Sequence, residues 1–282
     1  MLHVGWVFSL VRSGSSAASY AAAAPWDLPV ADELFGPWDR TGAPHHMPKR
    51  QAELVKAFRA VGHVLTAEIV GLAHEILREL AERDASGKGW VVCKCPHLMF
   101  TPKDFNTWFG QSASQGIAHH PAYLIRNPLR RVNSCYSRQW EHMLNDPYEL
   151  GVYRTFLTRW QEASVRLRYE DMRTDPASFF RTLYEGWTLP ATETDIARAC
   201  DYLGKRYHDS SAQSHEVSGE LKPRSESVWA APPEVLDVYL ADAQLLDFME
   251  AQGWPTKRSA YERLLPTRLW RTFRNATREV RL

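Results

Sequence analysis

The chain of 282 residues has a formal net charge of +1, with 44% hydrophobic and 24% charged residues. This balance is typical of a globular protein with one large α/β domain or two small ones, and it excludes a protein that coats nucleic acid by bulk electrostatics. No run approaches the roughly 20 apolar residues that span a bilayer. The four cysteines are too few for a disulfide scaffold, so we expect a cytoplasmic protein in a reducing compartment.

We interpret the apolar N-terminal segment as part of the fold. A secretory signal has a basic segment before an unbroken apolar stretch. Residues 1–5 contain no lysine or arginine, and Arg12 interrupts the apolar run that follows. We therefore do not expect a secretory signal here.

Short apolar segments alternate with stretches of helical periodicity along most of the chain. The expected strands are residues 3–10, 89–95, 123–126 and 165–169. The expected helices are residues 15–24, 54–65, 69–80, 153–160, 175–187, 193–203 and 234–252, and the expected loops are residues 25–48 and 205–233. Strands that alternate with helices indicate an α/β fold, a single domain whose central parallel sheet is flanked by helices.

The turn after the first expected strand gives the strongest indication of function. It places small and hydroxyl residues around one arginine, in the order Arg12-Ser13-Gly14-Ser15-Ser16. Small residues let backbone N–H groups converge on an anion, and a helix beginning near Ser15 would add the positive end of its dipole. The alternative is an ordinary turn whose serines only cap the helix. The glycine and lysine pattern of the Walker A loop is absent, which argues against a Mg²⁺-dependent NTPase.

A second motif leads from the third expected strand into a helix. Its sequence is Tyr123-Leu124-Ile125-Arg126-Asn127-Pro128. Asn127 suits the N-cap of a helix and Pro128 its first position. Ser134 follows Pro128 by six residues, about 9 Å along a helix axis. Arg126 and Ser134 could therefore bind one phosphate group.

These motifs resemble those of the PAPS-dependent sulfotransferases. That family has an arginine or lysine followed by Ser-Gly and two hydroxyl residues after its first strand, and later an Arg-Asn-Pro or Arg-Asp-Pro segment with a serine six residues on. A third match is Arg168-Tyr169-Glu170-Asp171-Met172. The three matches occur in the family's order and cover residues 3–190. The resemblance implies a P-loop NTPase-like sulfotransferase architecture. It also implies an enzyme that transfers a sulfuryl group from PAPS, releases PAP and uses no metal.

The resemblance also implies roles for individual residues. Those expected to hold the 5′-phosphosulfate are Arg12, Ser13, Gly14, Ser15 and Ser16. Arg126 and Ser134 would hold the 3′-phosphate, and Tyr169 would lie near the adenine or only pack at a strand end. The family often completes the 3′-phosphate site with a late Arg-Lys-Gly segment, which this sequence lacks. Lys222 or Arg224 could replace it, the alternative being that both are solvated loop charges.

The acceptor hydroxyl needs a base, and many cytosolic relatives carry it in a Lys-Thr-His run at a strand end. At the corresponding place this chain has Cys93-Lys94-Cys95-Pro96-His97. His97 is our first candidate because imidazole titrates near neutral pH, although a histidine beside a loop proline can also be structural. Lys94 would contact the transferring sulfonate or be a surface charge. Other branches use a carboxylate, which makes Glu33 the second candidate. Weaker candidates in expected loops are His45, His46, His119 and His120.

The C-terminal segment, residues 257–282, carries eight basic side chains against two acidic ones. Its apolar residues form one line on an expected helix: Leu269, Phe273, Ala276 and Val280. We expect residues 1–256 to form the sulfotransferase domain and the basic helix to dock on it. The alternatives are pairing of subunits in a homo-oligomer and binding to an anionic membrane.

The acceptor is expected to bind beside the two long loops, residues 25–48 and 205–229. Their aromatic residues favour an apolar or ring-containing acceptor, although sugars stack on such rings as well: Trp26, Phe35, Trp38 and Trp229. The expected partner is therefore a small-molecule, carbohydrate or lipid acceptor with a hydroxyl or amine, and not a nucleic acid. The alternative functions are an ATP-dependent small-molecule kinase and a non-catalytic nucleotide-binding relative.

Overall fold

The computed structural model describes residues 1–35, 50–62, 64–95, 108, 112–137, 150–203 and 231–262. Its internal contacts divide the chain into two compact units. The sheet unit comprises Met1–Arg126 and Thr155–Leu221, and the helical unit comprises Asn127–Arg154 and Lys222–Leu282. The expected boundary between residues 256 and 257 stays a prediction, because residues 263–282 lie outside the described part of the chain.

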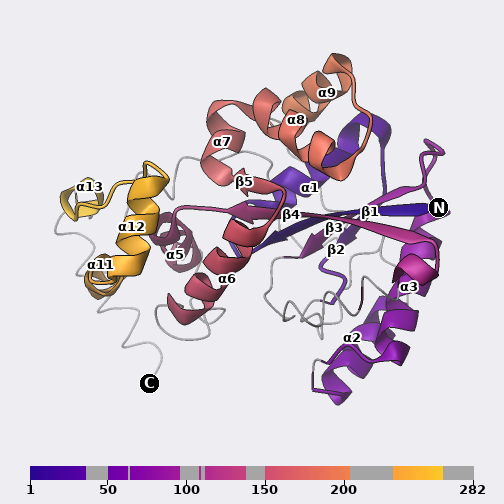
Figure 1. The fold of residues 1–282 in the computed structure, drawn as a ribbon, viewed down its shortest axis with the longest axis horizontal. Helices are drawn as coiled ribbons and strands as arrows, with labels where there is room; N and C mark the ends of the chain where they lie inside the picture. The colour runs from indigo at the N-terminus through magenta and orange to yellow at the C-terminus, as the bar shows by residue number, and fades with distance from the viewer. Residues whose placement is uncertain are drawn as a thin grey trace, which may run out of the picture. The chain divides into compact units, whose positions relative to one another are not determined.

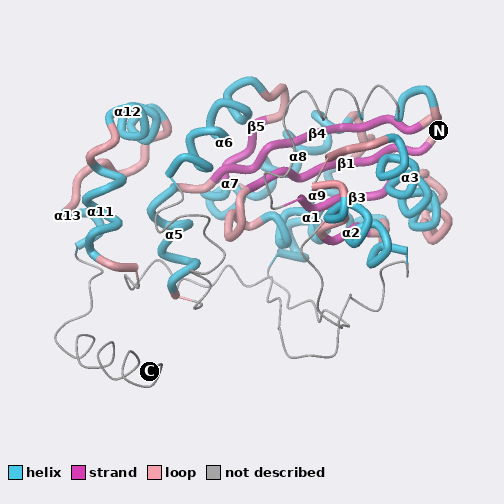
Figure 2. Tube along the Cα trace, turned by 90° about the horizontal axis from the view of Figure 1, so that it is seen from below, coloured by secondary structure: helices cyan, strands magenta, loops and turns pink. Residues whose placement is uncertain are grey.

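Parallel strands form the central sheet of the sheet unit (Figures 1 and 2). They are β1 (Leu2–Ser9), β2 (Val30–Asp32), β3 (Trp90–Cys95), β4 (Ile117–Ile125) and β5 (Arg166–Arg168). The strand order within the described residues is β2-β3-β1-β4-β5, and every adjacent pair is parallel. Val7 of β1 lies in register with Lys94 of β3 and with Ala122 of β4. The carboxyl ends of the strands therefore meet at one edge, where ligands bind in open parallel sheets.

Helices cover both faces of this sheet (Figure 1). Val7 packs in a core with residues of α1 (Ser15–Ala23), α8 (Pro176–Trp187) and α9 (Glu193–Leu203). Its neighbours in the chain, Trp6 and Phe8, pack on the other face with residues of α2 (Arg50–Ala60) and α3 (Ala67–Ala81). Burial on both faces explains the nearly unbroken apolar sequence of β1.

Helix α6 (Leu150–Glu162) begins in the helical unit and continues into the sheet unit. The indole nitrogen of Trp160, near its end, donates a hydrogen bond of 3.1 Å to the carbonyl oxygen of Leu167 in β5. The Phe156 ring lies 6.1 Å from the ring of Tyr123 in β4. These contacts attach α6 to the last two strands of the sheet.

The helical unit contains α5 (Pro128–Tyr136), α11 (Pro233–Leu240), α12 (Ala243–Ala251) and α13 (Ser259–Glu262). Asn127 is the N-cap of α5, as expected, and its side-chain oxygen accepts a hydrogen bond of 3.0 Å from the Arg130 amide. Its side-chain nitrogen donates to the Tyr261 hydroxyl at 3.1 Å, which joins α5 to α13. Among the described residues, no helix combines the length and the apolar character needed to cross a bilayer.

The α/β fold class is confirmed, but two strands differ from the sequence-based expectation. The segment expected to be loop contains η1 (Ala24–Trp26) and the three-residue strand β2. Strand β4 begins at Ile117, six residues earlier than expected, and includes Pro121. Strand β5 pairs only with Tyr123–Ile125 of β4, so in the described sheet Pro121 has a partner strand on one side only. A proline is tolerated where one side of a strand is open.

Three helical boundaries also differ. Tyr169 begins α7 (Tyr169–Thr174) instead of ending a strand. The pattern at residues 54–65 ends as a helix at Ala60, and Gly62 follows with a φ of 67°. The expected helix at residues 234–252 is two helices, because Asp242 caps α12 by accepting a hydrogen bond of 2.9 Å from the Leu245 amide.

Candidate functional site

The turn after β1 has a strained backbone. The Ser13 amide donates a hydrogen bond of 3.1 Å to the Leu10 carbonyl oxygen, which closes the turn. Arg12 has a φ of 68° and Gly14 a φ of 90°. Glycine adopts this left-handed region freely, but a side chain there is strained. A strained arginine at the carboxyl edge of a parallel sheet indicates a functional position.

Helix α1 starts directly after this turn, as the sequence predicts. Its N-cap is Gly14, and no side chain makes a capping hydrogen bond there. The residue at the N-cap is therefore a glycine and not one of the serines. The first intrahelical bond runs from the Ala18 amide to the Gly14 carbonyl oxygen at 3.0 Å. The amides of Ser15 and Ser16 precede that bond, so they face the N-terminal end of the helix, where anions bind.

The three matched motifs meet at this turn. Arg126, which follows β4, donates a hydrogen bond of 2.9 Å from Nη1 to the carbonyl oxygen of Arg12. Its guanidinium carbon lies 4.3 Å from the centre of the Tyr169 ring, at the start of α7. Arg126 thus contacts both the first turn and the segment after β5. The structure brings together one residue from each motif at the carboxyl edge of the sheet.

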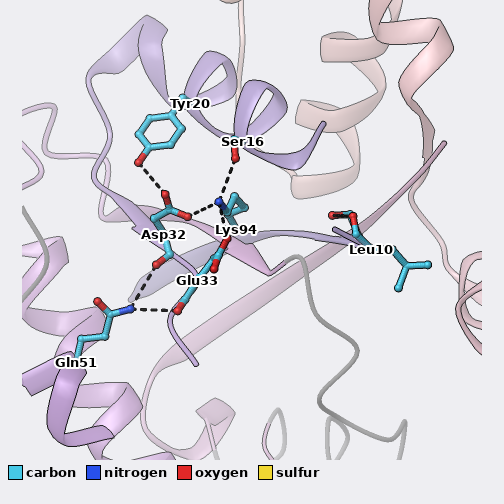
Figure 3. Close-up of polar contacts among 8 residues, drawn as sticks. Leu10, Ser16, Tyr20, Asp32, Glu33, Gln51 and Lys94 are labelled. Carbon is cyan, nitrogen blue, oxygen red and sulfur yellow. Dashed lines mark hydrogen bonds and ion pairs between the residues drawn. The ribbon is translucent and has the colours of Figure 1, made fainter. Parts of the chain in front are cut away.

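Lys94, near the end of β3, forms a buried ionic cluster beside the turn (Figure 3). Its ammonium nitrogen lies 2.5 Å from a carboxylate oxygen of Asp32 and 2.9 Å from one of Glu33. It also donates a hydrogen bond of 3.0 Å to the Ser16 hydroxyl oxygen in α1. The side chain of Lys94 is only 7% exposed, so the alternative of a surface charge is wrong.

The electrostatics of this cluster favour the charged form of the lysine. Burial on its own lowers the pKa of Lys94, but the adjacent carboxylates of Asp32 and Glu33 outweigh it and raise the pKa above its ordinary value. The ammonium is therefore a permanent positive charge at physiological pH. It links β2, β3 and the first turn of α1.

Glu33 itself stands in an unusual backbone conformation, with a φ of 55°. Its amide donates to the Lys94 carbonyl oxygen at 3.0 Å. The side-chain nitrogen of Gln51 in α2 donates to the carbonyl oxygens of Asp32 at 3.3 Å and of Glu33 at 3.1 Å (Figure 3). Backbone bonds on both sides thus hold the Glu33 carboxylate next to Lys94.

Sequence reasoning missed three members of this cluster: Asp32, Gln51 and Tyr20, whose hydroxyl donates to Asp32 at 3.3 Å. Asp32 and Glu33 follow the apolar pair Val30 and Ala31. An acidic pair after a short apolar run is the signal that could have located a strand end there. No sequence pattern connects Tyr20 or Gln51 to it.

Four expected site residues remain: Ser134, His97, Lys222 and Arg224. Ser134 is on α5 in the helical unit and is 2% exposed. Its pairing with Arg126 stays a prediction. His97, Lys222 and Arg224 lie outside the described residues.

Two of the weaker histidine candidates are in a strand and not in a loop. His119 and His120 lie in the middle of β4, away from its carboxyl end. Burial lowers the pKa of His119 to about 3 and that of His120 to about 4, with smaller contributions from neighbouring histidines. With pKa values lowered this far, these histidines are too weakly basic to take the acceptor proton, and they lie away from the carboxyl end of the strand.

Comparisons with known proteins give resemblances in fold. No family model matches the sequence, and neither does any curated protein. One similar solved structure is the sulfotransferase domain of the olefin synthase from Synechococcus PCC 7002. The two sequences are 16% identical, the match covers 90% of this chain and 95% of that chain, and the TM-score is 0.45. Another is a gluconokinase from Sinorhizobium meliloti 1021, with 17% identity, 66% and 91% coverage, and a TM-score of 0.30.

Proposed function

We propose that this protein is a PAPS-dependent sulfotransferase, which transfers a sulfuryl group to a hydroxyl or amine of a small-molecule, carbohydrate or lipid acceptor. One observation supports this proposal above the others. The Arg126 guanidinium contacts both the Arg12 carbonyl and the Tyr169 ring. Three motifs that match the same family in sequence are therefore adjacent in space.

The first turn and α1 would bind the 5′-phosphosulfate of the donor. The amides of Ser15 and Ser16 and the helix dipole supply positive potential at one point. Lys94 donates to the Ser16 hydroxyl oxygen, which leaves the hydrogen of that hydroxyl to be donated to an anion. Lys94 thus orients Ser16 toward the donor, and its own charge adds to the potential.

Arg12 would stabilise the charge that accumulates on the leaving phosphate. Sulfuryl transfer resembles phosphoryl transfer, in which positioning and electrostatic stabilisation supply most of the catalysis. A guanidinium is permanently charged and offers a bidentate fork, but it cannot donate its proton to the leaving group. We therefore assign Arg12 an electrostatic role only.

His97 is proposed as the base that takes the acceptor proton, with Glu33 as the second candidate. The Glu33 carboxylate is already engaged by Lys94 at 2.9 Å. In a His97→Ala variant we expect kcat to fall by about 10²–10⁴ while PAP affinity stays nearly unchanged. Activity of the unaltered protein should rise with pH through the titration of a histidine. The acceptor for this assay comes from incubation with ³⁵S-PAPS and a panel of phenols, alcohols, sugars and lipids.

The matched variant is Glu33→Gln, which removes the carboxylate charge and keeps the size of the side chain. If His97→Ala keeps full turnover and Glu33→Gln loses it with unchanged PAP affinity, Glu33 is the base. If both variants keep full turnover on the true acceptor, the assignment of a base at this edge is wrong.

The donor assignment predicts a site that distinguishes PAP from AMP by the 3′-phosphate. Removing one charged partner of a desolvated pair costs about 2–5 kcal/mol of binding free energy. The lower of these values corresponds to an affinity that is roughly thirtyfold weaker. Calorimetry on Arg126→Ala should show PAP affinity falling toward that of AMP. The control is Arg166→Ala, which removes an exposed arginine at the start of β5 and should leave both affinities unchanged. Equal affinities for PAP and AMP in the unaltered protein would contradict the proposal.

A further inference from the structure

The Tyr169 ring occupies the space between two parts of the proposed donor site. It follows β5 directly and is 7% exposed. One side of the ring faces the guanidinium of Arg126, whose central carbon lies 4.3 Å from the ring centre. At this distance a buried arginine and an aromatic ring attract one another through the ring quadrupole.

The edge of the same ring fills the space beside Gly14. A Cβ atom added to Gly14 would lie 2.5 Å from Cδ2 and 2.8 Å from Cε2 of Tyr169, and 3.2 Å from the Cε methyl of Met172. The left-handed φ of 90° excludes most side chains at Gly14 for a separate reason. The turn and the ring therefore fit together only because residue 14 has no side chain.

Arg126 completes a closed arrangement of contacts. It stacks on the ring and donates to the carbonyl oxygen of Arg12, two residues before Gly14. The ring thus contacts the turn directly through Gly14 and indirectly through Arg126. A movement of Tyr169 would shift the plane of the Arg126 guanidinium.

We infer that Tyr169 is a positioning residue for Arg126, so that the preference of the site for a 3′-phosphate depends on this ring. The inference rests on the proposed function. It differs from the expectation that Tyr169 lies against the adenine. Tyr169 is only 7% exposed. With one face of its ring against Arg126 and one edge against Gly14, little area is left for a stacked purine.

Calorimetry with PAP and AMP distinguishes the two roles. In Tyr169→Leu, we expect PAP affinity to fall by about tenfold, the effect of losing a desolvated cation–π contact, while AMP affinity changes by less than about twofold. Tyr169→Phe keeps the ring and should retain both affinities. An equal loss for PAP and AMP would show an adenine contact instead, and no loss for either would show a ring that only packs; both results overturn the inference.

A double-mutant cycle measures how strongly the two substitutions are coupled in their effect on PAP affinity. A general loss of packing would not produce this coupling. In an Arg126→Ala background, Tyr169→Leu should cause no further loss of PAP affinity, because the residue that it positions is gone. An additive loss overturns the inference. If Tyr169→Leu melts below the assay temperature, Tyr169→His takes its place in the same cycle, since it keeps a planar ring with a poorer face for a cation. If the unaltered protein binds PAP and AMP equally, the proposed function fails together with this inference; if only the variant pattern fails, the proposed function stands.

Discussion

Arg12 combines an unfavourable backbone conformation with the proposed role in charge stabilisation. A left-handed conformation costs a residue with a side chain about 1–2 kcal/mol. Hydrogen bonds from the Ser13 amide to the Leu10 carbonyl oxygen and from Arg126 Nη1 to the Arg12 carbonyl oxygen help to hold it. Strain of this kind is kept at functional sites when the surrounding structure enforces it. The presence of an arginine at this left-handed position is therefore explained by the proposed role of its side chain and not by the stability of the turn.

Two substitutions at Arg12 separate backbone strain from charge. Arg12→Ala removes the charge but keeps a Cβ in the left-handed region, whereas Arg12→Gly removes both. We expect the free energy of unfolding of Arg12→Gly to exceed that of Arg12→Ala by about 1 kcal/mol, measured by urea denaturation. Both variants should lose PAP affinity to a similar extent. Equal stability of the two variants would mean that the turn is not strained.

At the scale of single residues, the sequence predicts the site in part. Arg12, Gly14, Arg126 and Tyr169 could be placed at one edge because each follows, or was expected to end, a strand of a parallel sheet. The burial of Lys94 could not be predicted. Its partners Asp32 and Glu33 are some sixty residues away in the chain, and a lysine in an exposed loop would have the same local sequence.

Strand β4 contains two adjacent histidines, His119 and His120, whose pKa values are lowered by burial. The Trp6 indole nitrogen donates a hydrogen bond of 2.9 Å to Nδ1 of His119, and His120 lies 3.1 Å from a ring nitrogen of His3. The first contact connects β4 to β1 on one face of the sheet. Because burial lowers the pKa of His119 to about 3, the folded protein keeps this ring neutral at pH values where an unfolded chain binds a proton.

Stability should therefore decrease as the pH falls. The ordinary histidine pKa is 6.5, so below that value the unfolded state binds more protons than the folded state at His119. The free energy of unfolding then falls by up to about 1.4 kcal/mol per pH unit for this residue, until the pH reaches its folded pKa of about 3. His119→Asn keeps an acceptor for Trp6 but cannot titrate. Urea denaturation at pH 7, 6 and 5 gives the free energy of unfolding at each pH. Between pH 7 and pH 5 this free energy should fall clearly less for the variant than for the unaltered protein. An equal fall in both would contradict the burial of a neutral ring.

The elements that the sequence predicts well are those whose buried residues recur in a long and regular pattern. Strand β1 and helix α3 carry an apolar pattern of sufficient length for their period to be recognised. Strand β2 has only three residues, which is too short for any period. In the first part of β4, two histidines and a proline interrupt the apolar pattern by which a strand is recognised in the sequence. Their place in a strand depends on the neighbouring strands and not on local propensity. The break between α11 and α12 depends on one side-chain cap at Asp242.

At the scale of the whole molecule, strand order places the candidate site. The chain proceeds from β1 to β2 and β3 on one side of β1, and then to β4 and β5 on the other. This reversal creates a switch point at the carboxyl end of β1, where open α/β sheets bind their ligands. The strained turn, Lys94 and Arg126 all lie at that end. Fold class and motif order, both available from sequence, were sufficient to locate this edge.

As a phosphosulfate site, this edge of the sheet would bind its donor without the metal that an ATP-dependent kinase needs. Mg²⁺ normally neutralises the β- and γ-phosphates of ATP, whereas here Arg12, the amides of Ser15 and Ser16 and the helix dipole would neutralise the donor. The most direct test is the melting temperature with PAP or ATP, each in EDTA and in Mg²⁺. At a PAP concentration 100 times its Kd, binding adds about 2.7 kcal/mol to the free energy of unfolding. We expect PAP to raise the melting temperature equally in both buffers and ATP to raise it much less in either. Strong stabilisation by ATP with Mg²⁺, together with no effect of PAP, would contradict it.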